Sequence, residues 1–228
     1  MAMIEVKLQE TEERIARACQ SAGRDVHSVT LLAVSKTFSA TLVREAYAAG
    51  ARRYGENYVQ EGLDKIAELA ELRHDVEWHL IGPLQSNKTR PVAENFDWVH
   101  SIDRLKIAQR LSEQRPPELP PLNVCVQVNI SGEASKSGAL PGEAIALARA
   151  ISELPRLKLR GLMAVPEPAA DFETQRLPHR ALAELWAQAR AEGLALDTLS
   201  MGMSADMEAA IVEGATMVRI GSAIFGRR

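Results

Sequence analysis

The sequence is poor in cysteine and in aromatic residues. Its 228 residues contain two cysteines, Cys19 and Cys125, which do not form a C-x-x-C pair. This excludes a disulfide framework and a zinc site built from thiolates, and it suits a reducing cytosol. Aromatic residues make up only 4% of the chain. Leu, Val, Ile, Ala and Met must therefore supply the core, and the apolar fraction of 46% is ordinary for a globular protein.

Long apolar runs and a large excess of charge are also absent. No run approaches the ~20 residues that a membrane helix needs, and the acidic residues near the N-terminus do not fit a signal peptide. The formal net charge of −3 provides no general attraction to nucleic acid or to an anionic membrane. No Walker loop, G-x-G-x-x-G element or G-x-S-x-G element occurs. We therefore expect a cytoplasmic protein without nucleic-acid or membrane partners.

Short apolar runs alternate with amphipathic segments along the chain. Val, Ile and Leu dominate the runs, as in parallel strands that are buried on both faces. Eight such strands match the closure number of a barrel, and the length fits one barrel of roughly 200–250 residues. We therefore predict the α/β class, with a single (β/α)8 TIM-barrel domain over 1–228; a doubly wound sheet is the alternative. The predicted strands cover 30–36, 51–57, 76–82, 97–103, 122–129, 158–165, 196–203 and 216–226.

Helical segments lie before the first predicted strand and between the others. Residues 3–22 form an amphipathic helix with Ile4, Leu8, Ile15 and Ala18 on its apolar face. We expect this extra N-terminal helix to cap or flank the barrel. The other predicted helices cover 40–49, 58–72, 88–94, 104–114, 141–153, 171–192 and 205–213.

Lys36 is the sharpest single feature, because the chemistry of a barrel collects at the C-terminal ends of its strands. It closes the first predicted strand, directly after the apolar run LLAVS. Desolvation at the mouth of a barrel would make this amine a nucleophile toward carbonyl groups. The alternative is a lysine at the rim whose charge stays in water. Lys36 taken alone leaves both interpretations open.

Arg219 is the second candidate. It alternates with Val218 and Ile220 in the last predicted strand, so it lies on the opposite side from them. A guanidinium inside a barrel needs a partner, because an unpaired buried charge costs several kcal/mol. That partner is either an acid such as Glu56 or Asp103 or an acceptor on a ligand.

The loops after the seventh and eighth strands form a predicted phosphate cradle, in the place where barrels often bind phosphate. Ser200 lies in the seventh strand, and Ser204 is expected to cap the helix at 205–213. Gly221 and Ser222 offer backbone amides from the next loop, and such amides at a helix end bind anions. For Ser204 taken singly, an ordinary N-cap is the alternative. The two loops together favour phosphate.

Asn57 and His79 are weaker candidates. Asn57 is placed either to donate to a phenolate oxygen or to cap the following helix, and His79 either contacts a ligand or is a satisfied rim residue. The remaining histidines show no metal-ligand spacing. We therefore predict no metal site.

Seven stretches, in order and over nearly the whole chain, match one known family: LLAVSKT (31–37), YGENYVQE (54–61), WHLIGPLQSNK (78–88), VNISGEASKSG (128–138), RGLMAV (160–165), LSMGMSADMEAA (199–210) and VRIGSAIFG (218–226). On these stretches the sequence resembles the pyridoxal 5′-phosphate (PLP) homeostasis protein family, relatives of the N-terminal barrel of alanine racemase. The resemblance implies that Lys36 forms an internal aldimine with PLP and that Arg219 faces the pyridine nitrogen. It assigns the phosphate to Ser200, Ser204, Gly221 and Ser222, and it places Asn57 and His79 along the cofactor.

An arginine facing the pyridine nitrogen has a chemical consequence. Most PLP enzymes protonate this nitrogen with a carboxylate, which makes the ring a strong electron sink. Arginine keeps its own proton, so the nitrogen remains a neutral acceptor and the ring stabilises a carbanion less well. This restrains the chemistry to mild steps such as transaldimination or α-proton exchange.

Two functions of different classes remain. A PLP carrier needs only the cofactor site, whereas a two-base amino-acid racemase needs a proton donor on each face of the cofactor. The racemase relatives take the second donor, a tyrosine, from a domain after the barrel, and this chain stops at Arg228. We therefore expect a monomeric PLP carrier without robust catalysis, with apo-enzymes or free amino acids as partners. A racemase of low activity is the alternative, and a phosphosugar aldolase with a Schiff-base Lys36 is a third possibility.

Overall fold

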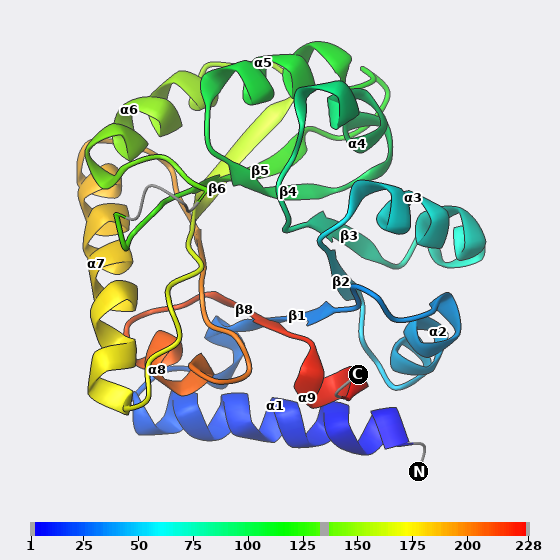
Figure 1. Ribbon diagram of the computed structural model, residues 1–228, viewed down its shortest axis with the longest axis vertical. Coiled ribbons are helices and arrows are strands. Elements are labelled where there is room, and N and C mark those ends of the chain that lie inside the picture. Colours follow the sequence, from blue (N-terminus) through cyan, green and yellow to red (C-terminus); the bar gives the residue numbers. More distant parts are fainter. Residues whose placement is uncertain (1–2, 133–136, 227–228) are drawn as a thin grey trace.

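The computed structural model describes residues 3–132 and 137–226, and its strands close into a parallel barrel (Figure 1). The order around the barrel is β1 to β8, and β1 pairs with both β2 and β8. The predicted α/β class and eight-stranded barrel are confirmed. Residues 133–136 of the matched stretch 128–138 lie outside the described residues. The strands are β1 Thr30–Val34, β2 Arg53–Glu56, β3 Glu77–Leu80, β4 Trp98–Ile102, β5 Leu122–Gln127, β6 Leu157–Met163, β7 Thr198–Ser200 and β8 Met217–Ile220.

Helices surround the barrel between successive strands (Figure 1). Among the described residues, no helix combines the length and the apolar character needed to cross a membrane. The α-helices are α1 Met3–Ser21, α2 Ala40–Ala48, α3 Val59–Glu68, α4 Thr89–Asn95, α5 Leu105–Gln114, α6 Pro141–Ser152, α7 Phe172–Ala191, α8 Met207–Val212 and α9 Ser222–Phe225. Short 3-10 turns cover Val26–Ser28, Ala70–Leu72 and Ser86–Lys88.

The extra N-terminal helix is α1. It buries Ile4, Leu8, Ile15 and Ala18, the four residues of the predicted apolar face. It contacts α2, α8 and α9, and in Figure 1 it runs beneath the region where β1 and β8 lie side by side. The helix therefore flanks the place where the first and last strands of the barrel meet.

Apolar side chains form two layers, one inside the barrel and one between the barrel and its helices. Alternation along β8 sends Val218 and Ile220 to the outer layer. The inner layer is small and consists of Leu32, Trp98, Cys125, Met163 and Met217, with Ile81 packed against it. Polar residues take much of the remaining interior, and their partners determine the architecture of the site.

The eighth apolar run is shorter as a strand than the predicted range 216–226. β8 ends at Ile220, and Ser222–Phe225 form the helical turn α9, which packs on α1. The prediction of one long strand is therefore wrong beyond Ile220. Periodicity alone cannot distinguish a short buried strand from a buried helical turn, because both are continuous apolar runs.

Candidate functional site

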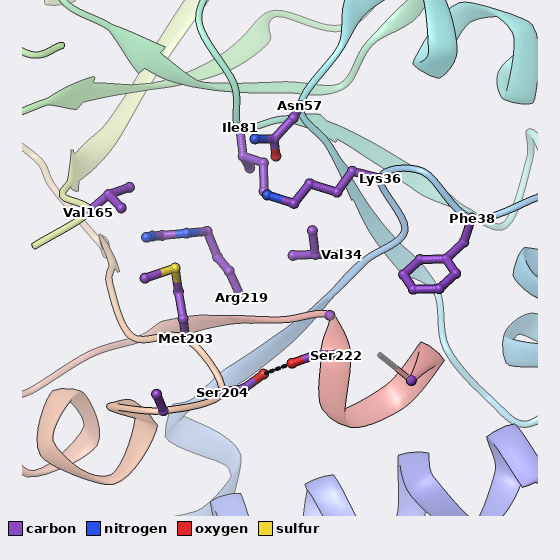
Figure 2. Close-up of a pocket in the computed structure, with 13 residues that line it drawn as sticks. Val34, Lys36, Phe38, Asn57, Ile81, Val165, Met203, Ser204, Arg219 and Ser222 are labelled. Carbon is purple, nitrogen blue, oxygen red and sulfur yellow. Dashed lines mark hydrogen bonds between the residues drawn. The ribbon is translucent and has the colours of Figure 1, made fainter. Parts of the chain in front are cut away.

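A cavity of about 530 Å³ opens where the strands end and their loops begin (Figure 2). It brings together six of the eight predicted site residues: Lys36, Asn57, Ser204, Arg219, Gly221 and Ser222. The rest of the lining is apolar or small and consists of Val34, Phe38, Ile81, Val165, Met203, Ala205 and Gly226. The cavity therefore combines a few polar groups with apolar walls, which is typical of a site for a small organic ligand.

Lys36 extends from the end of β1 into this cavity, and Figure 2 shows its side chain passing between Val34 and Ile81. Within the described part of the chain, its amine has no hydrogen-bond or ion-pair partner. Asn57 lies nearby, and its Oδ1 is buried without a hydrogen-bond partner. Because buried polar atoms are normally paired, these two groups leave hydrogen-bonding capacity for a ligand.

A buried ion pair holds the residue before Lys36. The Lys65 amine on α3 lies 2.8 Å from Glu56 Oε1 and donates to the Ser35 carbonyl oxygen at 2.6 Å. The Ser35 hydroxyl donates to the same Glu56 oxygen at 2.5 Å. Burial raises the pKa of Glu56, and the charge of Lys65 opposes this shift. These buried interactions therefore connect the end of β1 to β2 and α3.

The residue after Lys36 is held by the same helix. The Thr37 amide donates to the Glu61 carboxylate, which also accepts from the Lys65 amine at 2.7 Å. Thr37 has a φ of 65°, in the left-handed region that β-branched residues rarely adopt. Glu61 and Lys65 are not among the site residues predicted from the sequence. Their i, i+4 spacing on a predicted helix was the available signal.

Arg219 points from β8 into the barrel, as the alternation predicts, and is only 4% exposed. Its Nη1 donates to Ser200 Oγ and its Nη2 to the Ala164 carbonyl oxygen, both at 2.8 Å. Burial lowers the pKa of Arg219 to about 10. An ion pair with Glu56 or Asp103 is not formed, because Glu56 pairs with Lys65 and Asp103 with Arg104.

The loops after β7 and β8 meet at one side of the cavity. Ser204 Oγ and Ser222 Oγ lie 3.3 Å apart, and Figure 2 shows them facing each other. The amides at the start of a helix have no partners within that helix, so the first turn of α9 presents such groups here. The prediction that Ser204 caps α8 is wrong. That helix begins at Met207 with Asp206 as its N-cap residue.

His79 and Ser200, the other two predicted site residues, do not line the cavity. Both are fully buried inside the barrel. Ser200 Oγ is engaged by Arg219 and lies 2.9 Å from His100 Nδ1, while His79 stacks on Trp98 with ring centroids 5.1 Å apart. Neither residue lines the cavity, so their contact with a cofactor stays a prediction. Arg219 also comes from within a strand, but its long side chain lines the cavity, whereas the rings and hydroxyl of the buried His100, His79 and Ser200 do not.

Comparisons with known proteins agree with this fold. Residues 6–228 match the family described as alanine racemase, N-terminal domain. The pyridoxal phosphate homeostasis protein of Pseudomonas aeruginosa is 62% identical over 228 residues, which cover 100% of this chain and 97% of the relative. The protein of the same name from Escherichia coli is 56% identical over 222 residues, with coverage of 97% and 95%.

A solved structure shows the same likeness in three dimensions. PipY of Synechococcus elongatus, determined with PLP bound, is 38% identical and superposes with a TM-score of 0.81. The match covers 93% of this chain and 100% of the PipY chain. The chain therefore belongs to the pyridoxal phosphate homeostasis protein family, whose barrel is that of the alanine racemase N-terminal domain.

Proposed function

We propose that this protein binds PLP as a Schiff base on Lys36 and serves PLP homeostasis as a carrier rather than as an enzyme. The observation that carries the proposal is the Lys36 amine. The amine has no polar partner among the described residues, and it extends into the cavity. Hydrogen bonds of Ser35 and Thr37 hold the chain on both sides of Lys36. The names of the homologues and the PLP-bound state of PipY support the same cofactor.

The polar lining fits the reactive and charged ends of PLP. The Lys36 amine would form a C=N bond with the aldehyde carbon, and the carbonyl oxygen would leave as water. Ser204 and Ser222 would donate their hydroxyls to the phosphate, together with the amides of Gly221 and Ser222. Asn57, with a buried oxygen that lacks a partner, would lie beside the ring substituents.

Arg219 fits the pyridine nitrogen. Two protein acceptors occupy one N–H on each of its terminal nitrogens, and a guanidinium has five N–H donors in all. With a pKa of about 10, Arg219 remains protonated and donates at neutral pH. When bound, PLP supplies an electrophilic aldehyde and a ring that accepts electron density. Arg219 would leave the ring nitrogen unprotonated, which favours holding and releasing the cofactor over carbanion chemistry.

An amino-acid racemase is the second candidate, because the family includes the alanine racemase barrel. Racemisation requires a proton donor on each face of the cofactor. Among the described residues that line the cavity, Lys36 and Arg219 are the only ones with titratable side chains. Arg219 cannot act as a base at neutral pH, since it keeps its proton. A single base in the lining favours the carrier.

The test of the cofactor is spectroscopic. The purified protein with added PLP should show the absorbance band of a Schiff base, and borohydride reduction should fix PLP to the peptide that contains Lys36. Lys36→Ala should lose the band and keep its urea unfolding midpoint, while Lys106→Ala, at an exposed position on α5, should keep both. A protein that takes up no PLP would overturn the proposal.

Carrier and racemase are distinguished by proton exchange. We expect α-deuterium exchange on L- and D-alanine far below a turnover of about 1 s⁻¹, the lower end of ordinary enzyme rates. The carrier should also pass PLP to an apo-enzyme faster than it releases PLP to an aldehyde trap in solution. Racemisation at ordinary enzyme rates would establish the second candidate instead.

A further inference from the structure

A line of polar side chains runs from the cavity down through the barrel interior. Arg219 Nη1 donates to Ser200 Oγ at 2.8 Å, and Ser200 Oγ lies 2.9 Å from His100 Nδ1. His100 Nε2 lies 2.9 Å from His79 Nδ1. His79 Nε2 lies 3.4 Å from Glu77 Oε2, a charge contact without hydrogen-bond geometry, and Arg53 Nε lies 3.4 Å from the same oxygen. Four side chains thus connect the cavity to Glu77, which starts β3 at the opposite end of the barrel.

The line is enclosed between its two ends. Ser200, His100 and His79 are fully buried, and Trp98 packs against both histidine rings. Burial lowers the pKa of both histidines, so both rings are neutral at neutral pH. Glu77 is about half exposed and lines a pocket at the N-terminal end of the strands.

The two ends determine which way the hydrogen bonds run. Arg219 can only donate, so Ser200 Oγ accepts a hydrogen bond from it. The Ser200 hydroxyl can then donate its own proton to His100 Nδ1. A neutral His100 that accepts at Nδ1 carries its proton on Nε2 and donates it to His79 Nδ1. His79 then carries its proton on Nε2, where it faces the Glu77 carboxylate. The reverse order would place a bare ring nitrogen against that carboxylate.

We propose that Ser200, His100 and His79 are positioning residues that hold Arg219 toward the ligand through this one-way relay, and that Glu77 sets its direction from the opposite end of the barrel. The inference rests on the proposed function only in naming the ligand. It gives His79 and Ser200, which do not line the cavity, a role in the site through Arg219. It also couples a half-exposed carboxylate outside the cavity to the group that faces the cofactor.

The relay is tested first without PLP, by ¹⁵N NMR of the histidine side chains. Signals are assigned from the variants His79→Phe and His100→Phe. In the unmodified protein, both rings should carry the proton on Nε2 and a bare Nδ1. A charged ring, or a proton on Nδ1 of either ring, would overturn the proposal. The measurement on the unmodified protein needs no PLP, so it stands even if the proposed function fails.

The direction is tested by reversing the charge at the far end. Glu77→Lys presents a donor to His79 Nε2, so both rings should shift their proton to Nδ1. Asp197→Lys is the matched control, because Asp197 is also a carboxylate at the N-terminal end of the barrel and pairs with an arginine outside the relay. It should leave both tautomers unchanged. Wild-type tautomers in Glu77→Lys would contradict the assigned direction.

The link to Arg219 is tested with PLP bound. Glu77→Lys should shift the absorbance maximum of the bound cofactor, although Glu77 does not line the cavity, and Asp197→Lys should not. If the tautomers of His79 and His100 change in Glu77→Lys but the absorbance maximum of bound PLP does not, the positioning role is wrong. If even the unmodified protein takes up no PLP, the proposed function fails, while the NMR result still decides whether the relay exists.

Discussion

Thr37 adopts its left-handed conformation directly beside Lys36, with a φ of 65°. An L-residue in this region costs about 1–2 kcal/mol. The hydrogen bond from the Thr37 amide to Glu61 and the ion pair of Glu61 with Lys65 offset that cost. The strained backbone therefore persists, and it gives the neighbouring Lys36 a fixed direction into the cavity.

Gly221 shows how closely the cavity wall formed by the loop after β8 is packed. A Cβ there would lie 3.0 Å from the Val34 carbonyl oxygen and 3.3 Å from Val34 Cβ. We expect Gly221→Ala to push the loop away from β1, to lower the free energy of unfolding by about 1–3 kcal/mol and to weaken PLP binding. Urea unfolding and PLP titration measure the two effects.

The control for this variant is Gly142→Ala. Gly142 lies on α6, and a Cβ there would meet no atom within 4 Å. It should leave stability unchanged or raise it slightly, with PLP affinity unaltered. Equal losses in the two variants would show that the close approach to Val34 is not the cause.

At the scale of elements, the site depends on how α3 is joined to β1 and β2. Lys65 comes from α3, Glu56 from the end of β2, and Ser35 from the residue after β1. The ion pair is buried, with side-chain exposures of 6% and 0%. This pair does not line the cavity, and it positions the segment that carries Lys36.

We expect Lys65→Met to lower the free energy of unfolding by about 3–5 kcal/mol, since it leaves Glu56 as an uncompensated buried charge. The double variant Glu56→Met and Lys65→Met should recover much of this loss, because two apolar side chains replace the pair. Urea denaturation measures both. A double variant no more stable than Lys65→Met would show that the unpaired charge is not what destabilises the single variant.

At the scale of the whole molecule, the barrel has a partly polar interior. Its inner apolar layer is small, and the relay from Arg219 to Glu77 passes beside it. Neutral His79 and His100 are compatible with this enclosed place, but charged rings are not. The stability of the fold should therefore depend on pH through these two residues.

The sign follows from proton binding. Burial lowers the pKa of His79 and His100 below the ordinary value of 6.5. Below pH 6.5 the unfolded chain binds protons on these rings that the folded chain does not bind. The free energy of unfolding should thus fall as the pH falls from 6.5 toward the folded-state pKa values. The slope approaches about 1.4 kcal/mol per pH unit for each ring.

Urea unfolding between pH 7 and pH 5 measures this slope. His100→Gln should reduce it, whereas His74→Gln, at an exposed position, should not. The same slope in all three proteins would mean that His100 is protonated equally in the folded and unfolded chains.

Much of the candidate site follows from local patterns in the sequence. Lys36 comes directly after the run LLAVS, Asn57 closes the second predicted strand, and the alternation in the last strand places Arg219 inward. The depth of a residue does not follow from such patterns. His79 and Ser200 lie in strands and face inward, as Arg219 does, yet the cavity stops above them.

The sequence by itself determined the eight-stranded barrel, the flanking α1 and the end of the barrel where Lys36 lies. Those features depend on periodicity within short segments, which burial of one or both faces imposes directly. Only the tertiary structure decided the partners: Lys65 for Glu56, and His100 for both His79 and Ser200. Such pairs depend on strand register and on closure of the barrel. His100 and Ser200, for instance, are 100 residues apart, and no local pattern encodes that meeting.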